Sequence, residues 1–277
     1  LGLVGESGCG KTTLGKTILQ LYKPTEGEMI YEFENGPRNL EKLTSAEMDE
    51  ARKKIQIVFQ DPQSSLNPSF TIYQSLSDPL KKFGVRTKEE RRKIIGDLLE
   101  AVNMRREYMD RFPHEFSGGQ RQRIGIARAL CINPELVICD EAVSALDVSI
   151  QAQILNLLMD LQDEMGLTYM FVTHDLSVVK HISTNIMVTY LGKCVEIGSS
   201  DQIFENPCHP YTKALLAALP EATLEARDKP IQLLRGEISN PIKPKPGCRF
   251  ASRCPYCTEA VSERDRVGTE KETDIAW

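Results

Sequence analysis

A glycine-rich stretch near the amino end has the residue types and the spacing of a phosphate-binding loop. The stretch Gly5-Glu-Ser-Gly-Cys-Gly-Lys-Thr follows an apolar segment, residues 1–4, and precedes a helix that we expect at about 11–22. Glycines let backbone N–H groups converge on phosphate oxygens, and the helix start adds positive charge. We expect Lys11 to reach the β- and γ-phosphates and Thr12 to coordinate Mg²⁺. The alternative, an ordinary turn before a helix, is disfavoured by the strand and helix on either side.

The candidate phosphate-binding residues of this loop and of the first helical turn are Gly5, Glu6, Ser7, Gly8, Cys9, Gly10, Lys11, Thr12 and Thr13.

Two consecutive carboxylates follow an apolar strand later in the chain. The strand is Leu136-Val-Ile-Cys, and Asp140 and Glu141 come directly after it. At the carboxyl edge of a parallel sheet, beside the phosphate loop, Asp140 can hold Mg²⁺, and Glu141 can polarise a water for in-line attack on the γ-phosphate. The alternative is a pair that merely caps the next helix. Without the phosphate loop, that alternative would be preferred.

A second glycine pair marks the start of another helix. Ser117, Gly118, Gly119 and Gln120 precede a stretch that carries several arginines among apolar residues. Bare backbone N–H groups at a helix start form a second anion site. The alternative is a serine cap followed by flexible glycines, and the four residues by themselves favour it.

Apolar spacing indicates the elements that must position these side chains. We expect strands at 1–4, 28–33, 55–59, 136–139, 168–172 and 186–191, and a hairpin turn at Gly192-Lys193. Helices are expected at 11–22 (with Leu14, Ile18 and Leu21 on one face), 89–102, 148–165 and 211–219. Residues 38–51 look polar and exposed. Strands alternating with helices predict an α/β fold with a mainly parallel sheet, interrupted by a helical insertion at about 61–130.

Length and composition exclude several classes of protein. The chain has 277 residues, a formal net charge of −5 and 26% charged residues, which is ordinary for a globular protein. Its apolar runs are too short to span a bilayer, and its mild acidity argues against binding nucleic acid through bulk charge. Of the eight cysteines, five are scattered and are expected to be free thiols in a reducing compartment. The first residue, Leu1, lies inside a predicted strand, so we expect that the chain is a fragment.

The three motifs, in this order, resemble those of the ATP-binding-cassette family of transport ATPases, and the resemblance covers nearly the whole chain. Further positions match this family: Gln60 its Q-loop glutamine, Ser144-Ala-Leu-Asp147 its D-loop, and His174 its switch histidine. The resemblance implies a P-loop NTPase (RecA-like) core that binds ATP and Mg²⁺. It implies catalytic roles for Glu141, His174 and Gln60. It also implies that Thr12, Gln60 and Asp140 hold the metal.

In this family two cassettes close face to face around two ATP molecules. The resemblance therefore implies that Ser117–Gln120 and Asp147 of one cassette contact the nucleotide held by the other. ATP would then stabilise the closed dimer, and hydrolysis would release it.

A narrower resemblance, to the ATPases of oligopeptide and dipeptide importers, rests on three stretches. They begin at Phe59-Gln-Asp-Pro, at Asn206-Pro-Cys-His-Pro-Tyr and at Gly247-Cys-Arg-Phe. This resemblance implies a peripheral subunit on the cytoplasmic face of the membrane. Its partners would be a second, non-identical cassette, two permease subunits and an extracytoplasmic solute-binding protein, with no nucleic acid. Open alternatives are another small solute, such as nickel, and a cassette that works away from the membrane. A regulatory cassette without catalysis would lack Glu141 or His174.

These resemblances divide the chain into three expected regions. Residues 1–60 and 131–205 form the nucleotide-binding core, residues 61–130 the helical subdomain with the signature motif, and residues 206–277 a small Pro-rich appendage (Pro241, Pro244, Pro246). Some relatives hold an iron–sulfur cluster on four cysteines in this appendage. Here Cys248, Cys254 and Cys257 are present, but Val261 stands where the next cysteine is expected, so surface thiols are favoured over a cluster.

Overall fold

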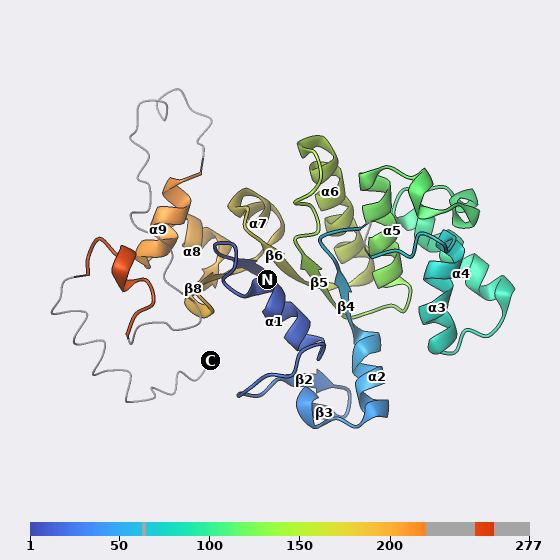
Figure 1. The fold of residues 1–277 in the computed structure, drawn as a ribbon, viewed down its shortest axis with the longest axis horizontal. Helices are drawn as coiled ribbons and strands as arrows, with labels where there is room; N and C mark the ends of the chain where they lie inside the picture. Colours follow the sequence, from blue (N-terminus) through green and yellow to red (C-terminus); the bar gives the residue numbers. More distant parts are fainter. Residues whose placement is uncertain (63–64, 220–246, 258–277) are drawn as a thin grey trace. The chain divides into compact units, whose positions relative to one another are not determined.

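The computed structural model describes residues 1–62, 65–219 and 247–257, and the chain divides into two compact units (Figure 1). One unit combines Leu1–Lys11 with the chain from Thr173 onward, and the other is Thr12–Val172. Pro241, Pro244, Pro246 and Val261, and with them most of the expected appendage, lie outside the described residues.

The Thr12–Val172 unit contains the strands β2 (Ile30–Phe33), β3 (Gly36–Asn39), β4 (Ile55–Val58), β5 (Leu136–Asp140) and β6 (Thr168–Thr173, whose last residue belongs to the other unit). Its helices are α1 (Lys11–Ile18, whose first residue belongs to the other unit), α2 (Ser45–Lys54), α3 (Ile72–Lys82), α4 (Lys88–Ala101), α5 (Gly118–Leu130) and α6 (Val148–Met165), with short 3-10 helices at Leu40–Lys42, Arg106–Asp110 and Pro113–Glu115.

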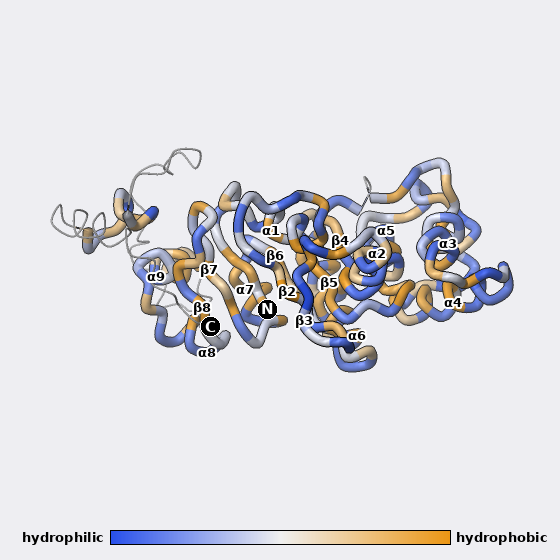
Figure 2. The backbone as a smooth tube through the Cα atoms, turned by 90° about the horizontal axis from the view of Figure 1, so that it is seen from below, coloured by the Kyte–Doolittle hydropathy of each residue, from blue (hydrophilic) through white to orange (hydrophobic). Residues whose placement is uncertain are grey.

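The sheet of this unit is parallel around β5, which carries the candidate site residue Asp140. Strand β5 pairs in parallel with β4 on one side and with β6 on the other. Val137, Ile138 and Cys139 in β5 are buried, and the tube is hydrophobic along this strand (Figure 2). An unbroken apolar run of this kind is typical of a strand covered on both faces. The predicted parallel α/β architecture is therefore confirmed.

The helical part of the unit packs around α5, which lies between α6 and the pair α3 and α4 (Figure 1). Threonine side chains cap the amino ends of the helices before it: Thr71 accepts from the N–H of Gln74 at 3.2 Å, and Thr87 from the N–H of Glu90 at 3.3 Å. Such caps satisfy backbone donors that a helix leaves unbonded. Among the described residues 65–130, every regular element is helical.

Three polar side chains connect the small β2–β3 hairpin to this sheet. The Tyr31 hydroxyl donates to Glu135 at 2.5 Å, and the Lys54 ammonium donates to the same carboxylate at 2.7 Å. These two donors hold the pKa of Glu135 below its usual value. The hairpin is thus attached where β4 and β5 begin.

The second unit contains β1 (Gly2–Val4), α7 (Leu176–Ile182), β7 (Asn185–Tyr190), β8 (Lys193–Ser199), α8 (Ser200–Glu205), α9 (Pro210–Ala217) and a 3-10 turn at Ala251–Arg253. Strand β1 pairs in parallel with β7, and β7 pairs antiparallel with β8 through the predicted turn at Gly192. Tyr190, Tyr211 and Phe250 pack in its core, with ring centroids 4.7 to 5.4 Å apart.

Two expectations about local structure are wrong. The first helix ends at Ile18 rather than at about residue 22, because Gln20 has a φ of +54°, and the expected apolar face is not buried: Leu14 is 40% and Leu21 54% exposed. The stretch 38–51, expected to be polar and exposed, contains the end of β3 and most of α2, and Leu40 and Ala51 are buried in it.

Candidate functional site

The glycine-rich loop leaves β1 directly and lies against β7. A Cβ atom on Gly5 would lie 2.2 Å from the carbonyl oxygen of Thr189, so this position requires glycine. The Thr189 hydroxyl donates to the carbonyl of Val4 at 3.1 Å and lies 3.3 Å from the sulfur of Cys9. The loop is therefore fixed at both its beginning and its middle.

The Lys11 side chain binds the backbone of this loop from its inner side. Its side chain is buried, and its ammonium group donates to the carbonyl oxygens of Gly5 at 2.7 Å and Glu6 at 3.1 Å. Ser7, Gly8 and Gly10 are exposed. An ammonium group wrapped by an exposed loop of backbone is the arrangement that binds phosphate oxygens in phosphate-binding loops.

In the other unit, the first helix and β5 bring two oxygen ligands together. The hydroxyl of Thr12 donates to the carboxylate of Asp140 at 2.8 Å, and Asp140 is only 4% exposed at the end of its strand. A hydroxyl and a carboxylate are the hard oxygen donors that suit Mg²⁺, which keeps several waters besides its protein ligands. The two residues therefore fit the expected metal.

Glu141 and Gln60 meet at the carboxyl ends of neighbouring strands. Val58 of β4 pairs with Cys139 of β5, and two residues further along each chain the Gln60 amide donates to the Glu141 carboxylate at 2.8 Å. Glu141 has a φ of +48°, and its N–H donates to the carbonyl of Val172 at 2.8 Å. Strained backbone of this kind is concentrated at functional sites.

The second glycine pair caps a helix. The hydroxyl of Ser117 accepts from the N–H of Gln120 at 3.3 Å, and the Gln120 side chain accepts from the N–H of Ser117 at 3.0 Å. A Cβ on Gly119 would lie 2.5 Å from the side chain of Ile150 on α6, so close packing requires this glycine. These residues therefore do cap α5, and Ser117 and Gly118 are exposed at its start.

Asp147 and His174 also lie at helix starts. Asp147 caps α6 by accepting from the N–H of Ile150 at 2.9 Å. His174 is exposed directly after β6, next to Asp175, which caps α7 by accepting from the N–H of Ser177 at 2.8 Å.

Of the predicted site residues that lie far apart in the sequence, the structure brings two pairs into contact in the Thr12–Val172 unit: Thr12 with Asp140, and Gln60 with Glu141. The loop residues Gly5–Lys11 and His174 belong to the other unit. Sequence reasoning missed three residues that touch the loop: Thr189, Tyr211 and Arg253. Thr189 lies in an expected strand and Tyr211 at the start of an expected helix, but no local pattern relates any of the three to a loop so distant in the sequence.

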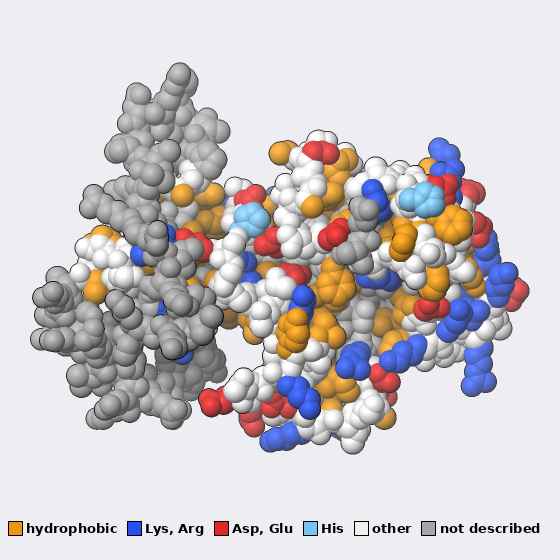
Figure 3. Space-filling model, viewed as in Figure 1, with side chains coloured by type: hydrophobic (Ala, Val, Ile, Leu, Met, Phe, Trp, Pro, Cys, Tyr) orange, Lys and Arg blue, Asp and Glu red, His pale blue; other side chains and the backbone are white. Residues whose placement is uncertain are grey.

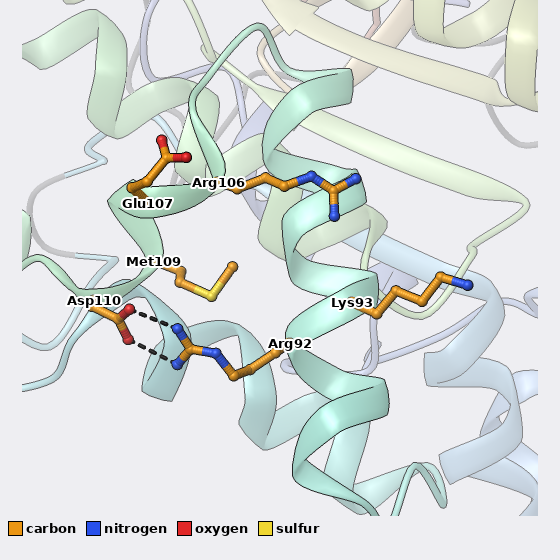
Figure 4. Close-up of a pocket in the computed structure, with 6 residues that line it drawn as sticks. All are labelled: Arg92, Lys93, Arg106, Glu107, Met109 and Asp110. Atoms are coloured by element: carbon orange, nitrogen blue, oxygen red, sulfur yellow. Dashed lines mark hydrogen bonds and ion pairs between the residues drawn. The ribbon is translucent and has the colours of Figure 1, made fainter.

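A separate surface pocket lies in the helical part, lined by Arg92, Lys93, Arg106, Glu107, Met109 and Asp110 (Figure 4). Lys and Arg side chains are frequent on the surface near α3 and α4 (Figure 3). Both arginines of the pocket already have carboxylate partners: Arg92 donates to Asp110 at 2.6 and 2.9 Å, and Arg106 to Glu100 at 2.6 Å. Pairing with Arg92 holds the pKa of Asp110 below its usual value.

The buried cysteines Cys131 and Cys139 are poor nucleophiles, because burial raises the pKa of each thiol to about 12. In the described parts of the chain, no three His, Cys, Asp or Glu side chains come together in a way that could hold a metal ion. Cys248 is exposed, and Cys254 and Cys257 are half-buried. None of the helices in these parts is long and apolar enough to cross a membrane.

Two family models match the chain. The model described as "ABC transporter" matches residues 1–144, and the model described as "Oligopeptide/dipeptide transporter, C-terminal region" matches residues 195–260.

Curated relatives share about half of the residues. A dipeptide transport ATP-binding protein of Haemophilus influenzae is 50% identical over 99% of this chain and 82% of its own length. A dipeptide transport ATP-binding protein of Escherichia coli is 51% identical over 92% of this chain and 75% of its own length. An oligopeptide transport ATP-binding protein of Salmonella typhimurium is 50% identical over 92% of this chain and 76% of its own length.

Solved structures agree with the sequence matches. A component of an ABC transporter complex from Clostridium perfringens has a TM-score of 0.64 at 29% identity, over 74% of this chain and 78% of its own. A dimeric ATP-binding cassette in a post-hydrolysis state, bound to ADP and Pi, has a TM-score of 0.62 at 33% identity. The match covers 72% of this chain and 84% of that cassette.

Proposed function

The chain belongs to the ABC transporter family, and from that membership we propose how its residues energise the import of dipeptides or oligopeptides. It is an ABC-type ATPase subunit, and ATP is its substrate. The match of residues 195–260 to the peptide-transporter C-terminal region and the names of the relatives support peptides as the solute class. The observation that carries the catalytic part of the proposal is the pairing of Thr12 with Asp140 and of Gln60 with Glu141.

The loop Gly5–Gly10 with Lys11 is the proposed phosphate-binding element, and Thr12 and Thr13 continue it into α1. Lys11 would exchange its bonds to the loop carbonyls for bonds to the β- and γ-phosphates. Thr12, Asp140 and Gln60 are the proposed holders of Mg²⁺, which would neutralise phosphate charge when bound. The hydroxyl–carboxylate contact of Thr12 and Asp140 supports this assignment.

Glu141 is the proposed general base. Its carboxylate lies at the end of β5, where the Gln60 amide orients it, and it would polarise a water toward the γ-phosphate. His174 is the proposed contact to the γ-phosphate, and its exposure supports this role.

We assign Ser117–Gln120 and Asp147 to the nucleotide of a partner cassette. Exposed backbone at the start of α5 supports an anion contact from outside the chain. Because nucleotide would then be shared by two cassettes, ATP binding would close the dimer and hydrolysis would open it.

The relatives are transport ATP-binding proteins, so we infer membrane permease partners for this chain. The finer assembly is a second, non-identical cassette, two permease subunits and an extracytoplasmic solute-binding protein, with this chain at the cytoplasmic face.

For the organisation of the chain, we propose a core of residues 1–60 and 131–205, a helical subdomain of residues 61–130 and an importer-type region of residues 206–277. The family match at 195–260 supports the importer-type region, and the helical elements of residues 65–130 support the helical subdomain.

Reconstitution of the intact protein with its permease and solute-binding protein tests the function. We expect ATP hydrolysis that rises when a dipeptide or oligopeptide is added together with the binding protein, and uptake of the peptide that requires ATP. A nickel salt replaces the peptide in a parallel assay. Stimulation by nickel alone would assign a different solute, and hydrolysis without any transport would remove the importer role.

A further inference from the structure

Glu6 of the glycine-rich loop is held at three points. Its carbonyl oxygen accepts from the Lys11 ammonium at 3.1 Å, and its N–H donates to the hydroxyl of Tyr211 at 2.9 Å. Its carboxylate oxygens lie 3.0 and 2.9 Å from one guanidinium nitrogen, Nη1, of Arg253. Two of these three contacts come from the part of the chain that matches the peptide-transporter C-terminal region.

The Arg253 side chain that contacts the loop is itself buried and packed against aromatic residues. Its side chain is only 6% exposed and that of Glu6 is 22% exposed. Nη1 also donates to the Tyr190 hydroxyl at 3.3 Å, and the guanidinium carbon lies 5.9 Å from the centre of the Tyr190 ring. Phe250, three residues earlier, is buried between Tyr190 and Tyr211.

We propose that Arg253 and Tyr211 are positioning residues that orient Glu6 and neutralise its charge, and that they thereby set the affinity of the glycine-rich loop for nucleotide phosphates. This inference rests on the proposed function. It assigns to the C-terminal region a role in the nucleotide site of its own chain.

The electrostatic reason is the charge of Glu6. A carboxylate in a loop that binds a polyphosphate repels the ligand, and the repulsion is strong where water is partly excluded. Arg253 cancels that charge within hydrogen-bond distance. The geometric reason is that the Tyr211 hydroxyl occupies the N–H of Glu6, so this peptide unit is directed to the C-terminal region.

Stability alone is a weak explanation for this pair. Burying an ion pair costs desolvation energy that the attraction between the charges repays only in part. The Nε atom of Arg253 is moreover buried without a hydrogen-bond partner in the described part of the chain. A purely structural contact of this kind is readily replaced by apolar packing, whereas a charge that opposes Glu6 is not.

The test measures binding of a non-hydrolysable Mg²⁺·ATP analogue to the intact protein by calorimetry. We expect Arg253→Met to raise Kd about tenfold, the effect of losing one charge-assisted hydrogen bond, and less at high salt because screening weakens the repulsion. In ATPase assays, KM should rise more than kcat, since Arg253 does not touch the reacting atoms. Arg253→Lys should restore part of the affinity, because a single nitrogen makes both contacts to Glu6.

The double variant Glu6→Gln with Arg253→Met separates charge compensation from structural support. Removing the carboxylate should lower the Kd of Arg253→Met toward the wild-type value, and a merely structural arginine gives no such rescue. Tyr211→Phe should also raise Kd, but Glu6→Gln should not rescue it, because that hydroxyl serves the backbone. Arg92→Met, which breaks a similar arginine–carboxylate pair with Asp110, is the control and should leave Kd unchanged.

Each outcome decides. If the wild-type chain does not bind the analogue, the proposed function fails and this inference fails with it. If the wild type binds and Arg253→Met binds equally well, or if Glu6→Gln gives no rescue, only the inference is overturned. If Arg253→Met does not fold, Arg253→Lys and Tyr211→Phe decide in its place, and unchanged Kd in both overturns the inference.

Discussion

Glu141, the proposed general base, is constrained in both its side chain and its backbone. It is held by Gln60 at 2.8 Å, and its backbone lies in the left-handed region at a φ of +48°. A non-glycine residue in this conformation is unfavourable and persists only where its surroundings fix it. Here the N–H bond to the Val172 carbonyl fixes it. The strain places the carboxylate at the sheet edge instead of extending the strand.

The first prediction is that Glu141→Gln stops ATP hydrolysis but leaves ATP binding intact. The amide keeps the shape and the contact to Gln60 but cannot polarise a water, and loss of a general base costs about 10²- to 10⁴-fold in rate. Turnover assays and equilibrium binding of ATP measure the two effects separately. Size-exclusion chromatography with ATP should still detect the dimer. Hydrolysis at the wild-type rate would remove Glu141 from the role of base.

At the scale of elements, the spacing of apolar residues predicted the long helices that have an apolar face. It missed a helix whose sequence signal is a capping motif. Residues 148–165 and 89–102 were predicted as helices because apolar residues recur on one face, and α6 and α4 confirm them. Helix α2 was missed because Ala51 alone is buried in it; the signal was the capping box of Thr44 with Glu47. Helix α3 lies inside the expected helical insertion, and its buried Ile72, Leu76 and Leu80 recur at helical spacing.

Site residues could be predicted where neighbouring strands end. The closeness of Thr12 and Asp140 could be expected from a phosphate loop beside a parallel strand. Gln60 was expected from the family resemblance, and its contact with Glu141 was seen only in the structure. The contacts of Glu6 could not be predicted, because long-range packing alone brings Tyr211 and Arg253 to the loop.

The second prediction concerns the packing of α5 on α6. Gly119→Ala would place a Cβ 2.5 Å from the Ile150 side chain and should destabilise the fold by about 1–3 kcal/mol, as overpacking does. Gly125→Ala in the same helix is the matched control. Its Cβ meets nothing within 4 Å in the described structure, so that variant should be neutral or more stable by about 1 kcal/mol. Urea unfolding of both variants measures the difference, and equal midpoints would contradict it.

For the whole molecule, the important feature is that segments distant in sequence share one core. In the unit that contains both ends of the described chain, Val4 of β1, Tyr190 of β7 and Phe250 of the C-terminal region belong to the same apolar cluster. The described residues around Phe250 are therefore part of the folded core of this unit.

The third prediction tests that view. Phe250→Ala should lower the stability of the protein by about 3–5 kcal/mol, because a fully buried aromatic ring is lost from between two tyrosines. Tyr256→Ala, in the same segment but 68% exposed, should have almost no effect. Thermal melting of the two variants decides, and similar losses for both would mean that the C-terminal segment is not packed as described.

The contact between Glu6 and Arg253 joins residues 247 positions apart. During synthesis on the ribosome, the loop therefore emerges well before its arginine partner is added. A nascent chain therefore cannot complete this end of its sheet until nearly all of the described polypeptide has been translated. Until then the Glu6 carboxylate lacks its partner, and on the inference proposed above the nascent chain does not yet have its native nucleotide affinity.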